Sequence, residues 1–331
     1  MKIIPIKLDK IDRKIISLLS VDSRTPLTEL ASVAHVSTDT AKNRLAALRQ
    51  SGVISALFAE PNLPALGLRT FRLYVDVSAM PQDLRQRLMR TYQTHPCVQW
   101  VAWGEGAWDV IIRFSLPDET AFKKEVESFM NRFGRYVKRK SITLGTYQSY
   151  FAPTYLAGGP RHGQIRFDRM QGQARLTATD YRILSALYDD ARTPTTTLAK
   201  AIGVTPEAVQ YRLKKLLAKG VIEGYSAWFD PQPAGLEFYK VFFWLQNLTP
   251  TLEKNLVRYL ESNPHLAYLV RVLGDWDLEA DVHVENTRQL HEFITGVEKR
   301  FPGLVRDHAT MAILENAVPN PVRQFLKHPD R

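Results

Sequence analysis

The sequence predicts an α+β protein made of two tandem copies of one unit, in which three short helices precede the element order βαββαβ. Three observations support this prediction: the chain matches itself at a constant shift, each copy starts with apolar residues at helical spacing, and strand-like and helix-like stretches alternate after them. With 331 residues, 45% of them hydrophobic, the chain is long enough to form several domains with their own cores.

The internal repeat keeps one register from the first helix to the last strand. The shift is 168 residues, the separation of Asp12 from Asp180. Further pairs at this shift are Arg24 and Arg192, Leu45 and Leu213, Gly52 and Gly220, Trp108 and Trp276, and Phe133 and Phe301. A register that holds over this length indicates that residues 8–150 and 176–318 share one fold.

Each copy opens with an amphipathic helix. In the first copy apolar residues recur at helical spacing from Leu8 to Leu19, and Asp9 stands where an N-cap side chain accepts from free backbone N–H groups. In the second copy Thr177 and Asp180 approximate a capping box, with Asp in place of the usual Glu or Gln. A short second helix follows in each copy.

A third helix begins after a tight turn, with Ser37 or Thr205 as its N-cap, and ends before Gly52 or Gly220. Its inward stripe is Ala41, Leu45 and Leu48 in the first copy and Val209, Leu213 and Leu216 in the second. Helix, tight turn and helix together predict a helix-turn-helix motif in each copy.

The remaining face of each third helix carries residue types that read DNA. Asn and Gln pair with adenine, Arg pairs with guanine, and Lys contacts phosphate. The candidate DNA-binding residues are Ser37, Thr38, Lys42, Asn43, Arg44 and Arg49 in the first copy and Thr205, Gln210, Tyr211, Arg212, Lys214 and Lys215 in the second. A net charge of +10 also favours a polyanionic partner such as double-stranded DNA. The alternative is an ordinary solvated face on a three-helix bundle.

The rest of each copy alternates between strand and helix patterns. The expected elements are 68–77, 82–94, 98–103, 108–115, 119–133 and 136–147, and then 238–245, 252–262, 266–273, 276–284, 287–301 and 305–314. This split βαβ order predicts an antiparallel sheet with helices on one face. The other face needs a cover, which the second copy of the same chain can supply as an intrachain pseudo-dimer.

The helix-turn-helix, the following βαββαβ domain and the Gly-x-x-Asp turns at 106–109 and 274–277 resemble the Lrp/AsnC family of feast/famine transcriptional regulators. The chain is similar to a tandem fusion of two members. The resemblance implies a winged-helix-like DNA-binding domain and a ferredoxin-like effector and oligomerisation domain in each copy. It also implies that the third helix enters the major groove, that amino acids or other small effectors bind near the turn, and that chains assemble further.

Six segments are expected on this basis. They are DNA-binding domain 1 (1–60), ferredoxin-like domain 1 (61–150), a linker (151–175), DNA-binding domain 2 (176–228), ferredoxin-like domain 2 (229–318) and a tail (319–331).

The resemblance carries an effector-binding role over to Gly106, Asp109, Gly274 and Asp277. A carboxylate suits the ammonium group of an amino acid, and glycine permits close backbone approach. The alternative is that the two Asp side chains only cap the hairpin through hydrogen bonds to backbone N–H groups.

The sequence offers little for catalysis or for metal binding. Cys97 is the sole cysteine and the eight histidines show no close metal spacing, so no metal, no cofactor and no catalytic residue is expected. The first residues lack a secretory signal and no apolar run is long enough to span a membrane, so a cytoplasmic protein is expected.

Two alternatives to a DNA-binding regulator stay open. One is an enzyme resembling the sirohaem decarboxylases of haem biosynthesis, which share this layout and occur as fused pairs. The other is a ligand sensor that no longer binds DNA.

Overall fold

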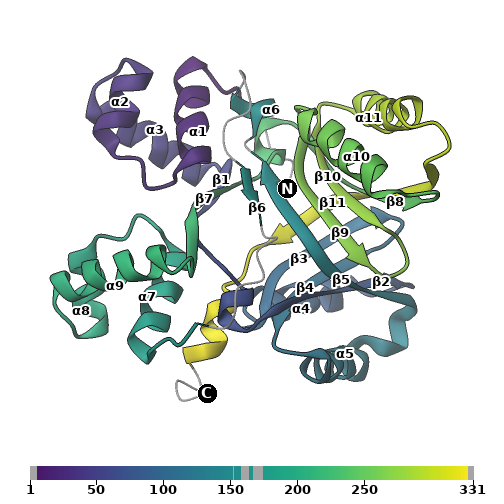
Figure 1. Cartoon of the computed structure of the whole chain (residues 1–331), viewed down its shortest axis with the longest axis horizontal. Coiled ribbons are helices and arrows are strands. Elements are labelled where there is room, and N and C mark those ends of the chain that lie inside the picture. The colour runs from purple at the N-terminus through teal and green to yellow at the C-terminus, as the bar shows by residue number, and fades with distance from the viewer. Residues whose placement is uncertain (1–5, 152, 158–163, 167–173, 327–331) are drawn as a thin grey trace. The chain divides into compact units, whose positions relative to one another are not determined.

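The computed structural model describes residues 6–151, 153–157, 164–166 and 174–326, and Figure 1 shows the arrangement of its elements. Each copy places three helices and a strand before the order βαββαβ. The predicted α+β class and tandem architecture are confirmed. Within the described residues, no helix combines the length and the apolar character that crossing a membrane requires.

The first helix-turn-helix consists of α1 (Lys10–Val21), α2 (Leu27–Ala34) and α3 (Thr38–Gln50). Asp9 caps α1 in a full capping box, because its carboxylate accepts from the Asp12 N–H while the Asp12 carboxylate accepts from the Asp9 N–H. The fully or almost fully buried core of this domain includes Ile15, Ile16, Leu19, Leu30, Ala41, Leu45 and Leu48.

The second helix-turn-helix repeats this arrangement with α7 (Ala178–Asp189), α8 (Thr195–Ile202) and α9 (Pro206–Ala218). Thr177 and Asp180 form the predicted capping box at the start of α7. After each third helix comes a short strand, and these strands, β1 (Ile54–Pro61) and β7 (Ile222–Phe229), pair in a two-stranded sheet.

The α/β domain of the first copy has an antiparallel sheet with the strand order β3-β4-β2-β5. Its elements are β2 (Arg69–Val77), α4 (Gln82–Gln93), β3 (Val98–Gly106), β4 (Val110–Leu116), α5 (Glu119–Phe133) and β5 (Val137–Phe151). Both helices pack on one face of the sheet, where residues such as Leu88 and Phe129 join a core with Leu73, Val101 and Ile112. This is the ferredoxin-like arrangement.

The α/β domain of the second copy has the order β11-β8-β10-β9, which is the same topology. Its elements are β8 (Glu237–Leu245), α10 (Pro250–Ser262), β9 (Leu266–Leu273), β10 (Leu278–Val284), α11 (Thr287–Arg300) and β11 (Val305–Ala317). A separate apolar core, with Leu256 and Phe293 from the helices and Val241 from the sheet, lies between the helices and the sheet.

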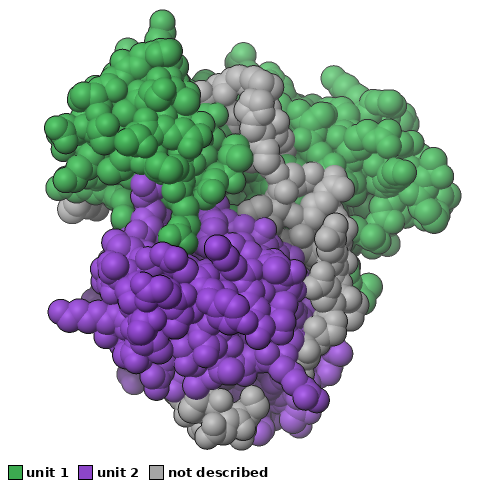
Figure 2. All heavy atoms as spheres, turned by 60° about the vertical axis from the view of Figure 1, so that its left-hand side comes forward, with its two compact units in different colours: residues 1–56, 146–167, 226–313 green, residues 57–145, 168–225, 314–331 purple. Residues whose placement is uncertain are grey.

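The compact units of the chain do not coincide with its sequence copies. Unit 1 comprises residues 1–56, 146–167 and 226–313, and unit 2 comprises residues 57–145, 168–225 and 314–331 (Figure 2). Each unit therefore joins the helix-turn-helix of one copy to the α/β domain of the other. In unit 1, for example, the Asp230 N–H donates to the Val53 carbonyl oxygen at 3.0 Å.

The stretches expected as linker and tail contain defined elements. β5 continues to Phe151 and pairs there with β6 (Gln164–Arg166), and a short helix α6 (Thr154–Ala157) lies between them. The other residues of the expected linker up to 173 lie outside the described part of the chain. The expected tail includes a 3-10 helix, η4 (Pro321–Leu326), in unit 2.

The tail packs on α7 through polar and aromatic contacts. The Asn320 side-chain amide donates to the Ser185 carbonyl oxygen at 2.8 Å, and the Arg323 guanidinium contacts both carboxylate oxygens of Asp189 at 3.0 Å. Residues 320–326 of the expected tail (319–331) are therefore held on α7 by these contacts.

Candidate nucleic-acid interface

α3 and α9 each bury the predicted apolar stripe and expose the opposite side. Ten of the twelve candidate DNA-binding residues are exposed: Ser37, Thr38, Lys42, Asn43 and Arg49 in the first copy and Thr205, Gln210, Tyr211, Lys214 and Lys215 in the second. Among them, Tyr211 is 67% exposed, which is unusual for a large aromatic side chain with a role in a core. The amide, ammonium and hydroxyl groups of this set suit both base edges and phosphates.

The hydroxyl groups of Ser37 and Thr205 act as N-caps. They accept from the N–H groups of Thr40 and Ala208 at 3.1 and 3.2 Å. The Ser37 hydroxyl also shares a hydrogen bond of 2.9 Å with the Thr40 hydroxyl. A hydroxyl that caps a helix as an acceptor still has a hydrogen to donate, so these groups suit a phosphate oxygen.

Arg44 contacts acids of its own domain. Its Nη1 lies 2.9 Å from Asp9 Oδ2 and 3.4 Å from Asp12 Oδ1. Hydrogen bonding to the Asp12 N–H and the charge of Arg44 hold the pKa of Asp9 below its ordinary value, whereas burial raises the pKa of Asp12. The guanidinium thus ties α3 to the capped start of α1.

Arg212 repeats this contact in the second copy. Its Nη1 lies 2.9 Å from Asp180 Oδ1 and donates to Thr177 Oγ1 at 3.0 Å. Burial raises the pKa of the Asp180 carboxyl, but hydrogen bonds from Thr177 and Arg212 outweigh it and the net pKa is lowered.

The two arginines therefore position the helices of the helix-turn-helix fold, and their predicted contact with DNA stays a prediction. The sequence contained a signal for this, because both members of the Asp-Arg pair are kept in both copies. By contrast, the exposed Lys42 and Asn43 correspond to Gln210 and Tyr211, so the two copies present different exposed side chains at these positions.

Replacing Arg44 by Ala is expected to lower the free energy of unfolding of the first helix-turn-helix by about 1–2 kcal/mol, because the Asp12 side chain, only 8% exposed, loses its cation. The matched Lys42→Ala variant removes an exposed cation and should change stability by less than about 0.5 kcal/mol. Hydrogen exchange of α1 peptides measures both. Equal protection in the two variants would contradict the positioning role of Arg44.

The Gly-x-x-Asp turns hold the ends of neighbouring strands. Asp109 Oδ2 accepts from the Val77 N–H at 2.8 Å, and Asp277 Oδ2 accepts from the Leu245 N–H at 2.7 Å. Burial, opposed by the Val77 hydrogen bond, raises the pKa of Asp109. Both carboxylates therefore have a structural role, which was the alternative interpretation of this motif, and effector binding by them stays a prediction.

The Arg139 side chain holds the first turn, and the second copy has no arginine at the equivalent position. The Arg139 Nη2 donates to the Ala107 carbonyl oxygen at 2.6 Å, and its guanidinium carbon lies 4.3 Å from the centre of the buried Trp108 ring. The second copy has Asp307 in place of Arg139. Gly106 has a φ of 127°, a backbone conformation that favours glycine. This conformation explains why a glycine stands at this position of the turn.

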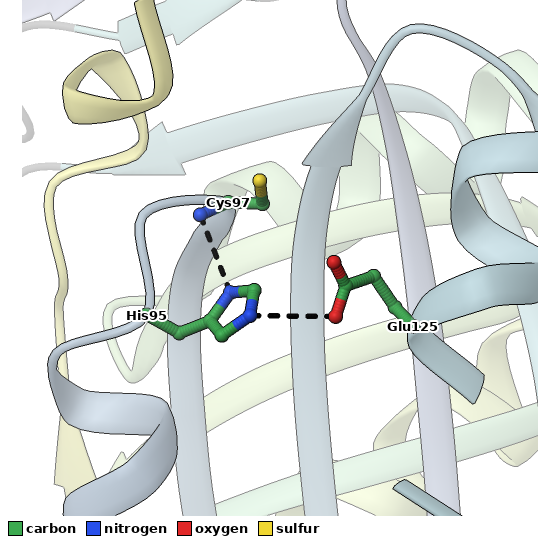
Figure 3. A group of neighbouring side chains, drawn as sticks. All are labelled: His95, Cys97 and Glu125. Carbon is green, nitrogen blue, oxygen red and sulfur yellow. Dashed lines mark hydrogen bonds and ion pairs between the residues drawn. The ribbon is translucent and has the colours of Figure 1, made fainter. Parts of the chain in front are cut away.

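His95, Cys97 and Glu125 form a polar cluster at the edge of the first α/β domain (Figure 3). Each offers one ligand atom within 4.8 Å of the others. However, His95 Nδ1 accepts from the Cys97 N–H at 3.4 Å, which leaves the hydrogen on Nε2, 3.3 Å from Glu125 Oε2. In this tautomer both ring nitrogens take part in hydrogen bonds, whereas a metal would need the lone pair of one of them. The cluster is not evident from sequence spacing, because Glu125 lies on α5, away from His95 and Cys97 along the chain.

Comparison with known proteins identifies the two helix-turn-helix regions independently. An AsnC-type helix-turn-helix domain matches residues 8–49, and a winged helix-turn-helix DNA-binding domain matches residues 176–223. The transcriptional regulator LrpA of Pyrococcus horikoshii is 33% identical over 138 residues, which are 38% of this chain and 93% of that protein. The regulator AldR of Mycolicibacterium smegmatis is 29% identical over 116 residues, 35% of this chain and 68% of AldR.

Solved structures of a sirohaem decarboxylase match almost the whole chain. The sirohaem decarboxylase NirDL, in complex with an iron-uroporphyrin III analogue, has a TM-score of 0.62 at 14% identity, over 96% of this chain and 97% of NirDL. At this identity the likeness shows a shared fold.

Proposed function

The chain belongs to the Lrp/AsnC family of DNA-binding transcriptional regulators, and we propose that it binds one operator through both of its helix-turn-helix domains. The observation that carries this proposal is the presence of two complete, capped helix-turn-helix motifs in a single chain, each with an exposed polar third helix. A single chain then performs the task of a symmetric dimer.

The two reading helices differ in the residues they expose, so the operator should be an imperfect palindrome. Lys42 and Asn43 of α3 occupy the same positions of the motif as Gln210 and Tyr211 of α9. Base-edge contacts set sequence preference, and different side chains at the same position select different bases.

Selection of DNA fragments from a random library by the purified full chain should enrich one asymmetric motif. In the variant Lys42→Ala with Asn43→Ala, preference should weaken in one half-site, and in Gln210→Ala with Lys214→Ala in the other. The matched control is Lys123→Ala with Lys124→Ala on α5, where Lys123 is 76% exposed. No enrichment by the unaltered chain, or loss of both half-sites in the control, would contradict the proposal.

Under the same proposal the protein acts in the cytoplasm, where its DNA target lies. It acts as a regulator and not as a catalyst, and several chains assemble into larger oligomers. A small effector such as an amino acid would bind at the Asp109 or Asp277 turn through the carboxylate oxygen that does not accept from the strand. Calorimetric titration of the full chain with the common amino acids, repeated with Asp109→Asn and Asp277→Asn, tests this part.

A second candidate function rests on the match to NirDL along the whole chain. A decarboxylase of this type would bind a tetrapyrrole, whose Soret absorbance shifts on binding. Titration with sirohaem and with iron-uroporphyrin separates the candidates, because a regulator of the proposed kind selects DNA and leaves both spectra unchanged.

A further inference from the structure

The second helix-turn-helix has a pocket of about 210 Å³ beside its reading helix. Arg175 lines it from the segment before α7, Arg212 and Lys215 line it from α9, and Lys219 lines it from the end of that helix. Lys215 and Lys219 are four residues apart and so lie on one face of the helix. The pocket therefore gathers four cations from two segments of the domain.

Three of these cations have no acid within ion-pair distance among the described residues. Asp180 also lines the pocket, but it is paired with Arg212 at 2.9 Å. Arg175, Lys215 and Lys219 are exposed and keep their charge for another partner. Like charges gathered in this way repel one another, so a bound anion lowers the electrostatic energy of the site.

The first helix-turn-helix lacks this charge at the equivalent positions. The positions of Arg175, Thr177, Lys215 and Lys219 hold Lys7, Asp9, Ala47 and Ser51. Because the Arg-Asp pair is present in both copies, the surface has a formal charge of +3 in the second copy and zero in the first. The two helix-turn-helix domains can therefore be compared within one chain, because they share a fold and differ in the net charge of this surface.

We infer that the pocket of Arg175, Lys215 and Lys219 binds a backbone phosphate of DNA, so that the second helix-turn-helix contributes more phosphate contacts to affinity than the first. This inference rests on the proposed function and adds an unequal share of phosphate binding between its two DNA-binding domains. A phosphodiester carries one negative charge and several acceptor oxygens, which ammonium and guanidinium groups bind well.

The place of the pocket favours DNA over a free anion. Tyr211 lines it and is exposed, and its neighbour Gln210 lies on the face predicted to meet base edges. When a reading helix lies in the major groove, the phosphates of the two strands border it, and cations beside the helix contact them.

The test is the salt dependence of operator binding by the full chain. Each cation that neutralises a phosphate contributes about 0.9 to the slope of log affinity against log salt concentration. Lys215→Ala with Lys219→Ala should therefore reduce the slope by about 1–2 and weaken binding about 10- to 100-fold at low salt. The matched control, Lys123→Ala with Lys124→Ala, removes equal charge on α5 and should leave the slope unchanged.

A reciprocal variant distinguishes a loss of phosphate binding from misfolding, because it adds positive charge to the other domain. Ala47→Lys with Ser51→Lys places the same charges on the first helix-turn-helix and should increase the slope. The inference is overturned if the unaltered chain binds its operator with the same slope as Lys215→Ala with Lys219→Ala, or if the reciprocal variant has no effect. If the unaltered chain selects no DNA, the proposed function fails as well, so the two failures are distinguishable.

Discussion

Replacing Lys240 by Met is expected to destabilise the second α/β domain by about 3–5 kcal/mol. Lys240 on β8 is 2% exposed, and its ammonium group contacts two carboxylates of β10 that are also buried, those of Glu279 and Asp281. The Lys240 Nζ lies 3.4 Å from Glu279 Oε2. Removing the cation leaves two negative charges close together in a medium that solvates them poorly.

The register of the sheet brings these charges together. Lys240 stands directly opposite Asp281 in the β8–β10 ladder, and Glu279 is two residues away on the same face. Trp276 Nε1 donates to the other oxygen of Glu279 at 3.1 Å. The three charged groups and the indole thus form one buried network, in which the loss of one member affects all the others.

Urea unfolding combined with hydrogen exchange of β8 and β10 peptides measures the effect. Lys254→Met removes an exposed lysine of α10 and should change stability by less than about 0.5 kcal/mol. Adding Glu279→Gln and Asp281→Asn to Lys240→Met should recover much of the loss, because the two buried groups that lost the Lys240 cation are then neutral. Equal stability of Lys240→Met and Lys254→Met would contradict the network.

Local signals explain why the elements of this fold were predictable. The helix expected at residues 119–133 runs from Glu119 to Phe133, since Asp118 caps its start and the Gly134 region ends it. The capping boxes and the inward stripes of the third helices also depend only on residues within about one or two helical turns. Such patterns are complete within a short stretch of sequence.

Long-range pairing was not predictable in the same way. Each compact unit combines the helix-turn-helix of one copy with the α/β domain of the other. A periodic pattern of apolar residues does not predict this combination, because it reports only on local structure. The pairing of Arg44 with Asp12 spans 32 residues and appears in the sequence only as an Asp and an Arg that both copies keep. Charge type alone therefore predicted a DNA contact for Arg44, whereas the geometry adds an ion pair within the domain that the sequence pattern did not indicate.

The pH dependence of unit 2 is expected to be governed by Glu60, a fully buried carboxyl group on β1. Burial, with the charge of Glu223 on β7 as a second cause, raises the pKa of Glu60 to about 8, although Arg113 on β4 opposes the shift. Tyr188 of α7 belongs to the same buried group, and the carboxyl charge contributes to the raised pKa of its hydroxyl. These groups lie where the second helix-turn-helix meets the first α/β domain within unit 2.

The sign of the effect follows from proton binding. Between pH 4.5 and 8 the folded chain keeps the Glu60 proton and the unfolded chain releases it, so stability falls as pH rises, by at most about 1.4 kcal/mol per pH unit. Below this range both states are protonated and the full stability is present. Above it both are ionised, and the loss is complete at about 3–5 kcal/mol.

Glu60→Gln should remove this slope, because a neutral amide of the same shape carries no charge at any pH. The variant should match the unaltered chain near pH 4.5 and exceed it by several kcal/mol near pH 8.5. Unfolding of both proteins across this range, followed by hydrogen exchange of β1 and α7, gives the difference, and Glu127→Gln at an exposed position of α5 is the control. Parallel curves for Glu60→Gln and the unaltered chain would show that Glu60 is ionised at neutral pH. The charge of Arg113 would then outweigh burial, and this carboxylate would stabilise the junction as the anionic partner of that guanidinium.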